Sequence, residues 1–115
     1  MLAGTAALSA DTRLHGKWMR DDRNVVVTIK PCGSQTCATN TWIGDTSGGE
    51  NVGDRLIMKL DRSSDSLLTG DAYDPKRSLT LKVKIDVSET RFVSRGCIAL
   101  GMLCKTASWR RVEAR

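Results

Sequence analysis

Histidine and aromatic residues are scarce in this sequence of 115 residues, and their scarcity limits the chemistry that it supports. His15 is the single histidine, so an acid–base or metal centre built on imidazole groups has at most one candidate. The aromatic residues are Trp18, Trp42, Tyr73, Phe92 and Trp109. Because few rings are available for stacking on bases, we expect an aliphatic core and no nucleic-acid partner.

Long apolar runs and the common catalytic motifs are also missing. No apolar stretch approaches the roughly 20 residues that a membrane-spanning helix needs, so we expect the chain not to span a membrane. No G-x-S-x-G motif, phosphate-binding loop or dinucleotide fingerprint occurs. Asp71 and Asp74 are the best acid–base pair, but Asp74 precedes Pro75, which is typical of a turn. We therefore expect a protein that is not an enzyme and holds no cofactor.

Four cysteines are present, and they fall into two close pairs, Cys32 with Cys37 and Cys97 with Cys104. Their C-x4-C and C-x6-C spacings differ from the knuckles of structural zinc sites and from the redox C-x-x-C motif. We therefore expect no metal at these cysteines, and two β-hairpins explain the spacings better.

A two-residue turn at Leu100–Gly101 places Cys97 directly opposite Cys104. The same count around a turn at Ser34–Gln35 places the first pair opposite each other. Opposed residues of an antiparallel pair lie about 4.5–5.5 Å apart at Cα, which is within disulfide range. Each closed loop would stabilise the fold by about 2–2.5 kcal/mol. Two such disulfides indicate an oxidising compartment, so we expect a periplasmic or secreted protein.

Residues 79–87 alternate strictly between apolar and polar side chains, which is the pattern of a half-buried strand. Seven further β-like runs occupy residues 15–20, 25–30, 38–43, 55–62, 67–73, 90–100 and 103–112. No amphipathic helix is evident, and the turn signals recur every 8–12 residues or so, as in sandwiches and barrels. Closure removes exposed edges, so we expect an all-β fold: a small antiparallel up-and-down β-barrel of about eight strands.

We expect this barrel to be a single domain over residues 13–115. Residues 1–12 are small and apolar, and Ala7-Leu8-Ser9 resembles the cleavage pattern of a secretory signal peptide. The alternative interpretation is an ordinary disordered N-terminus.

The charge of the chain is distributed unevenly. Residues 1–75 carry 8 Lys/Arg and 10 Asp/Glu, a net charge of −2, whereas residues 76–115 carry 10 and 3, a net charge of +7. Lys82 and Lys84 share the outward face of their predicted strand, with Arg91 and Arg95 close by in sequence. These four cations are our candidate surface for binding an anion, and a simply solvated face is the alternative.

The two ends of the predicted barrel carry a possible contact. Trp18 lies on the first strand, next to Gly16, and Arg111 lies on the last strand, which pairs with the first in a closed barrel. A guanidinium over the Trp18 ring would close the barrel floor through a cation–π contact worth about 0.5–2 kcal/mol. This arrangement resembles the lipocalin-type (calycin) barrels.

The chain also resembles the bacterial family called domain of unknown function 2147, which consists of small exported proteins with a lipocalin-like fold. The residues that carry the resemblance are Gly16-Lys17-Trp18, Pro31-Cys32-Gly33 with Cys37, Gly70-Asp71-Ala72-Tyr73-Asp74-Pro75, and Gly96-Cys97 through Cys104 to Trp109-Arg110-Arg111-Val112. The resemblance implies the fold and export but no reaction. Two departures are Ala38, where glycine commonly follows the second cysteine, and the short Gly-rich segment 44–54, which would alter specificity if it forms part of a binding mouth.

Two function classes follow from these patterns. A lipocalin-like barrel suggests a binding module for a small apolar or amphipathic ligand, although the inward aliphatic side chains of such short strands could fill the barrel unaided. The alternative is a cell-envelope interaction protein that binds anionic lipid, glycan or protein through its basic outer surface. The sequence leaves the oligomeric state open.

Overall fold

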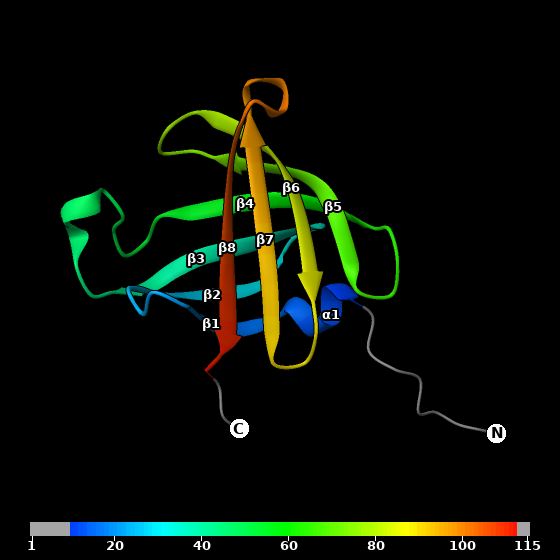
Figure 1. The fold of residues 1–115 in the computed structure, drawn as a ribbon, viewed down its shortest axis with the longest axis horizontal. Helices are drawn as coiled ribbons and strands as arrows, with labels where there is room; N and C mark the ends of the chain where they lie inside the picture. Colours follow the sequence, from blue (N-terminus) through cyan, green and yellow to red (C-terminus); the bar gives the residue numbers. More distant parts are fainter. Residues whose placement is uncertain (1–9, 113–115) are drawn as a thin grey trace.

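The computed structural model describes residues 10–112, which form a closed antiparallel barrel of eight strands (Figure 1). Each strand pairs with its neighbour in sequence, and β8 pairs with β1 to close the barrel. The strands are β1 (Gly16–Arg20), β2 (Val25–Cys32), β3 (Gln35–Ile43), β4 (Arg55–Arg62), β5 (Leu67–Asp74), β6 (Leu79–Val87), β7 (Arg91–Ile98) and β8 (Leu103–Arg111). The predicted all-β up-and-down barrel is confirmed.

A short helix, α1 (Ala10–Leu14), enters one end of the barrel (Figure 1). The side chains of Ala10 and Leu14 are completely buried, so the folded part of the chain begins no later than Ala10 rather than at residue 13. A helix of five residues is too short to show a helical period in the sequence. Residues 1–9, which contain the expected cleavage pattern, lie outside the described residues. Within residues 10–112, no helix is long and apolar enough to cross a membrane.

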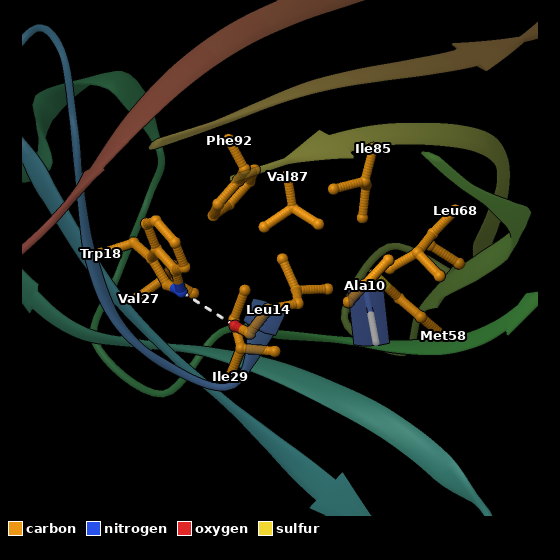
Figure 2. Packing of buried hydrophobic residues seen from close by; sticks show 11 residues of the cluster. Ala10, Leu14, Trp18, Val27, Ile29, Met58, Leu68, Ile85, Val87 and Phe92 are labelled. Atoms are coloured by element: carbon orange, nitrogen blue, oxygen red, sulfur yellow. Dashed lines mark hydrogen bonds between the residues drawn. The ribbon is translucent and has the colours of Figure 1, made fainter. Parts of the chain in front are cut away.

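The hydrophobic core fills the end of the barrel that α1 enters, which we call the floor. Trp18 Nε1 donates a hydrogen bond of 2.9 Å to the carbonyl oxygen of Leu14, which fixes the helix to β1 (Figure 2). The core residues come from α1 and from six of the strands: Ala10, Leu14, Trp18, Val27, Ile29, Met58, Leu68, Ala72, Ile85, Val87 and Phe92. The helix therefore contributes two side chains, Ala10 and Leu14, to the core that the strands enclose.

Both predicted disulfides are present. In the second hairpin the predicted register holds, because Cys97 lies opposite Cys104 with 4.1 Å between their Cα atoms. The amide of Met102 donates to the carbonyl of Ala99 at 3.1 Å, so the tight turn is centred on Leu100–Gly101 as predicted.

The structure corrects the predicted register of the first hairpin. Its two-residue turn lies one residue earlier, at Gly33–Ser34, and the φ of 66° at Gly33 suits glycine because it has no side chain to clash in that region. Cys32 therefore lies opposite Gln35, while Cys37 lies opposite Lys30. The disulfide links the two strands diagonally, over a Cα distance of 5.7 Å.

At Gly70 the backbones of β4 and β5 lie so close together that no side chain fits between them. A Cβ atom there would overlap the carbonyl oxygen of Lys59 and lie 3.1 Å from the Cα atom of Leu60. Both are backbone atoms, which cannot move without separating the two strands.

We expect Gly70→Ala to lower the free energy of unfolding by about 2–3 kcal/mol, because the added methyl group forces the backbone apart. Gly96→Ala is the matched control, since its Cβ would make ordinary contacts of 3.7 and 3.9 Å with Leu81 and Val83. Urea unfolding of both variants measures the difference. Equal destabilisation by the two substitutions would contradict the close approach at Gly70.

Candidate functional site

The end of the barrel opposite the floor, which we call the mouth, is accessible to solvent. Along β6 and β7 the inward side chains are buried near the floor, at Ile85, Val87 and Phe92, whereas nearer the mouth Leu81, Val83 and Ile98 are only partly buried. The partly buried apolar residues that pack on the core are Ala38, Leu56, Leu60, Leu81, Val83 and Trp109. The interior is thus filled at one end and lined with accessible apolar side chains towards the other.

A loop between β3 and β4, residues 44–54, is fastened beside the mouth by three contacts, and we call it the mouth loop. Arg20 donates to the two carboxylate oxygens of Glu50 at 2.7 and 3.0 Å. Arg77 donates to the carbonyl of Gly49 at 3.1 Å. Lys76 and Asp54 form an ion pair of 3.2 Å. The mouth loop is therefore held from β1 and from the turn between β5 and β6.

Asn24 and Asn40 fix the two ends of the mouth loop. Asn24 accepts a hydrogen bond of 2.7 Å from the amide of Asp45 through its side chain, and its carbonyl accepts one of 2.9 Å from the amide of Gly44. The carbonyl of Asn40 accepts a hydrogen bond of 2.8 Å from the amide of Gly53. These bonds leave the centre of the loop to be positioned by Glu50.

Electrostatics favour the charged form of the contact between Arg20 and Glu50. The pKa of Glu50 lies below its ordinary value of 4.5, chiefly because Arg20 donates hydrogen bonds to it, although partial burial opposes this shift. The charge of Lys105 lowers the pKa of Glu50 further. The same contact, together with a hydrogen bond to Asp22, raises the pKa of Arg20.

Lys105 is a cation near the mouth without a carboxylate partner among the described residues. It lies on β8 directly opposite Gly96, which is itself opposite the inward-facing Val83 of β6. No ion pair forms at Lys105 within the part of the chain that the structure describes. Its ammonium group is therefore available to an anion at the mouth.

A column of aromatic rings links the mouth to the floor. The ring of Trp18 meets that of Phe92 edge-on, with 4.8 Å between centroids, and Phe92 stacks on Trp109 at 5.5 Å. The guanidinium of Arg20 lies 5.9 Å from the Trp109 ring. The residue that holds the mouth loop is thus in contact with a ring whose neighbours belong to the core.

The structure brings together the three residues predicted at the barrel floor. The guanidinium of Arg111 lies 4.1 Å from the ring centroid of Trp18. Gly16 has a φ of 133°, and a Cβ atom there would lie 2.5 Å from Nη1 of Arg111. A side chain at Gly16 would therefore push the guanidinium off the ring.

Arg111 also binds three backbone carbonyl oxygens at the floor. Its guanidinium donates to Arg13 at 2.6 Å, to His15 at 3.0 Å and to Glu89 at 2.7 Å. These carbonyls belong to α1, to the residue before β1 and to the connection between β6 and β7. One side chain therefore joins segments from both ends of the sequence.

The four cations predicted to bind an anion lie on the outer surface but are not equally available. Lys82 pairs with Asp71 at 2.9 Å, and Arg91 pairs with Asp21 at 3.0 Å. Lys84 lies directly opposite Arg95 across β6 and β7. Neither of these two forms an ion pair among residues 10–112. The structure thus reduces the available part of this surface to two residues.

The residues considered for acid–base chemistry lie apart from one another. Asp71 pairs outward with Lys82, whereas Asp74 is buried and accepts hydrogen bonds from Arg77 and from the amide of Lys76. His15 lines a surface depression of about 580 Å³ at the floor. Among the described residues, no three His, Cys, Asp or Glu side chains are grouped so as to hold a metal ion. That the protein is not an enzyme stays a prediction.

Comparison with known proteins identifies a family match. Residues 16–111 match the family described as "Uncharacterized protein conserved in bacteria (DUF2147)". No curated protein and no solved structure matches the chain. The matched range runs from the glycine of the floor to the arginine of the floor, so it covers the whole barrel.

We expect Arg111→Lys to lower the free energy of unfolding by about 2 kcal/mol, because lysine keeps the charge but lacks the planar fork that reaches three carbonyls and a ring. Arg110→Lys is the matched control on the outer face of the same strand and should change stability by less than about 0.5 kcal/mol. Thermal and urea unfolding measure both values. A similar effect of the two variants would contradict the role of Arg111.

The contact between Arg20 and Glu50 should depend on pH. Because folding lowers the pKa of Glu50, its contribution to stability is complete above about pH 4.5 and is lost as the pH falls through the lower value in the folded state. Glu50→Gln should therefore be less stable than the natural protein at neutral pH, and the difference should shrink in acid. Urea unfolding across this range tests the sign. A difference that stays constant with pH would contradict it.

Proposed function

Since the chain belongs to the bacterial DUF2147 family, whose description assigns no reaction, we propose a function from the geometry of its barrel. We propose that the protein is an exported, non-enzymatic binding module that holds a small amphipathic ligand in the mouth. The observation that carries this proposal is the change along β6 and β7, from buried inward side chains at the floor to partly exposed apolar side chains towards the mouth.

The lining of the mouth favours a ligand with a short apolar part. Leu81 and Val83 offer apolar contact area, and each buried CH₂ group of a ligand gains about 0.8 kcal/mol. The core residues and α1 occupy the floor, so we expect a short alkyl chain to bind better than a long one.

The charges at the mouth favour an anionic head group. Lys105 lies close enough to Glu50 to lower its pKa, and no carboxylate of residues 10–112 pairs with it. The guanidinium nitrogens of Arg20 already donate to Asp22 and Glu50, so Lys105 supplies the cation for the head group. A carboxylate or phosphate on the ligand is the chemical group that suits the ammonium group of Lys105.

Export is supported by the two disulfides. Both pairs are joined in a small bacterial protein, and disulfides persist in oxidising compartments such as the periplasm. We therefore place the ligand among the small amphiphiles of the bacterial envelope.

The alternative function uses the outer surface instead of the mouth. Lys84 and Arg95 are like charges directly opposite each other, an arrangement that destabilises a sheet unless an anion offsets it. This pair supports binding of an anionic envelope component. Because Lys82 and Arg91 are already paired with carboxylates, the outer surface offers fewer available donors than its sequence suggested.

Thermal unfolding with octanoate, decanoate and laurate, and with the matching alcohols, tests the proposal. A binding acid at about 100 times its Kd should stabilise the protein by about 2.7 kcal/mol and raise the Tm by about 10 °C or more. Lys105→Glu should remove the preference for acids over alcohols, since the head group loses its cation. Gly96→Leu should weaken both series, because the new side chain projects beside Leu81 and Val83.

Lys84→Glu is the control for Lys105→Glu, since it makes the same change of charge on the outer face. It should leave the preference for acids unchanged. If no member of either series shifts the Tm, the mouth does not bind such amphiphiles. If Lys84→Glu weakens the acids as much as Lys105→Glu does, the binding is a property of the outer surface.

A further inference from the structure

The hairpin between β7 and β8 ends in a group of exposed apolar side chains. We call residues 98–103 the hairpin tip, and it lies at the top of the barrel in Figure 1. Relative to the extended chain, Leu100 is 104% exposed, Met102 82% and Leu103 61%. No residue of the tip is charged. These large side chains contribute little to the core, so their presence needs another explanation.

The backbone of the hairpin tip is held in an unfavourable conformation. Ala99 and Leu100 have φ values of 54° and 57°, a region in which residues with a side chain are uncommon. The disulfide between Cys97 and Cys104 links the pair of opposed residues next to the tip. Strain of this kind is typical of functional segments. A loop fixed in advance also loses less conformational entropy when it binds.

Cations surround the base of the hairpin tip. Lys82 lies opposite Cys97, and Lys105 follows Cys104 directly on β8. One or two residues further from the tip are Arg95 of β7 and, opposite it, Lys84 of β6. Two carboxylates lie near this group: Asp71 pairs with Lys82, and Asp86 lies two residues from Lys84 on the same outer face of β6. The apolar tip is thus bordered by a strongly basic surface.

We propose that the hairpin tip inserts into the surface of an anionic lipid bilayer, with Leu100, Met102 and Leu103 among the acyl chains. Lys84, Arg95 and Lys105 would then lie at the depth of the lipid head groups. Apolar insertion combined with basic residues at the interface is the combination that holds peripheral proteins on anionic membranes. The charge complementarity favours anionic over neutral lipid.

The size of the hairpin tip argues against a protein as its occupant. Stable protein–protein interfaces bury about 800 Å² on each partner, far more than three large side chains at the end of one hairpin supply. A lipid surface needs no complementary shape, and it accepts a narrow apolar projection. Because the tip borders the mouth, insertion would bring the mouth next to the bilayer, but the inference does not depend on the ligand proposed above.

The test is co-sedimentation with vesicles of phosphatidylcholine, with and without phosphatidylglycerol. The protein should bind the vesicles that contain phosphatidylglycerol, and added salt should weaken this binding. The double variant Leu100→Gln with Met102→Gln should bind roughly tenfold or more weakly, because two apolar side chains no longer enter the bilayer. Inorganic phosphate should not compete with the vesicles, because it offers no apolar phase into which the tip can insert.

Two matched variants separate insertion from general adhesion. Val52→Gln changes a side chain of the mouth loop that is 63% exposed and should leave vesicle binding unchanged. Lys84→Gln with Arg95→Gln should lower the affinity and flatten its dependence on salt. Intact mass and Tm check that each variant keeps both disulfides and its fold.

Three results would overturn the proposal. The first is no binding to vesicles with phosphatidylglycerol, and the second is unchanged binding by the Leu100/Met102 double variant. The third is a dimer in sedimentation velocity that dissociates in that double variant, since the tip would then be covered by a second copy of the chain.

Discussion

The guanidinium of Arg111 is the contact on which closure of this barrel depends. β1 has only five residues, and its ladder with β8 has three residue pairs, whereas β7 and β8 share eight. The seam between the first and last strands is therefore the weakest in the sheet. Cation–π contacts reinforce it at two levels, because Arg111 of β8 covers Trp18 of β1, and Arg20 of β1 lies over Trp109 of β8. Each strand thus supplies an arginine to a ring of the other.

The same contacts connect the stable floor to the more exposed mouth. Trp18, Phe92 and Trp109 form one column of rings, with an arginine at each end. At the mouth that arginine is Arg20, whose remaining hydrogen-bond donors hold Glu50 and hence the mouth loop. The position of the loop therefore depends on a side chain that rests on the core. A change in core packing around Phe92 would reach the mouth through two ring contacts and one ion pair.

The sequence predicted the features that depend on local pattern. The strands could be located from the alternation of apolar and polar residues. The register of each disulfide-linked hairpin depended on identifying its turn residues. The register predicted around Leu100–Gly101 was right. The register predicted for the first hairpin was wrong, because Gly33 was not recognised as the first residue of the turn. The contact between Arg20 and Glu50 was not predicted, because the two residues are thirty positions apart and meet only through the path of a loop. The sequence did not predict the helix α1, because the burial of its side chains depends on a barrel interior that later strands form.

The distribution of unfavourable features along the barrel supports the proposals for its mouth. The floor satisfies the usual requirements of a stable fold, since its core side chains are buried and each nitrogen of the Arg111 guanidinium donates a hydrogen bond. At the opposite end, Leu100 combines a left-handed backbone with complete exposure, and Lys84 lies opposite Arg95 without a carboxylate partner among the described residues. Neither feature stabilises the folded protein by itself. Unfavourable features of this kind are expected at functional sites, because binding of a ligand or a surface can offset their energetic cost there. Their concentration at one end favours a function for that end, with the floor acting as its rigid support.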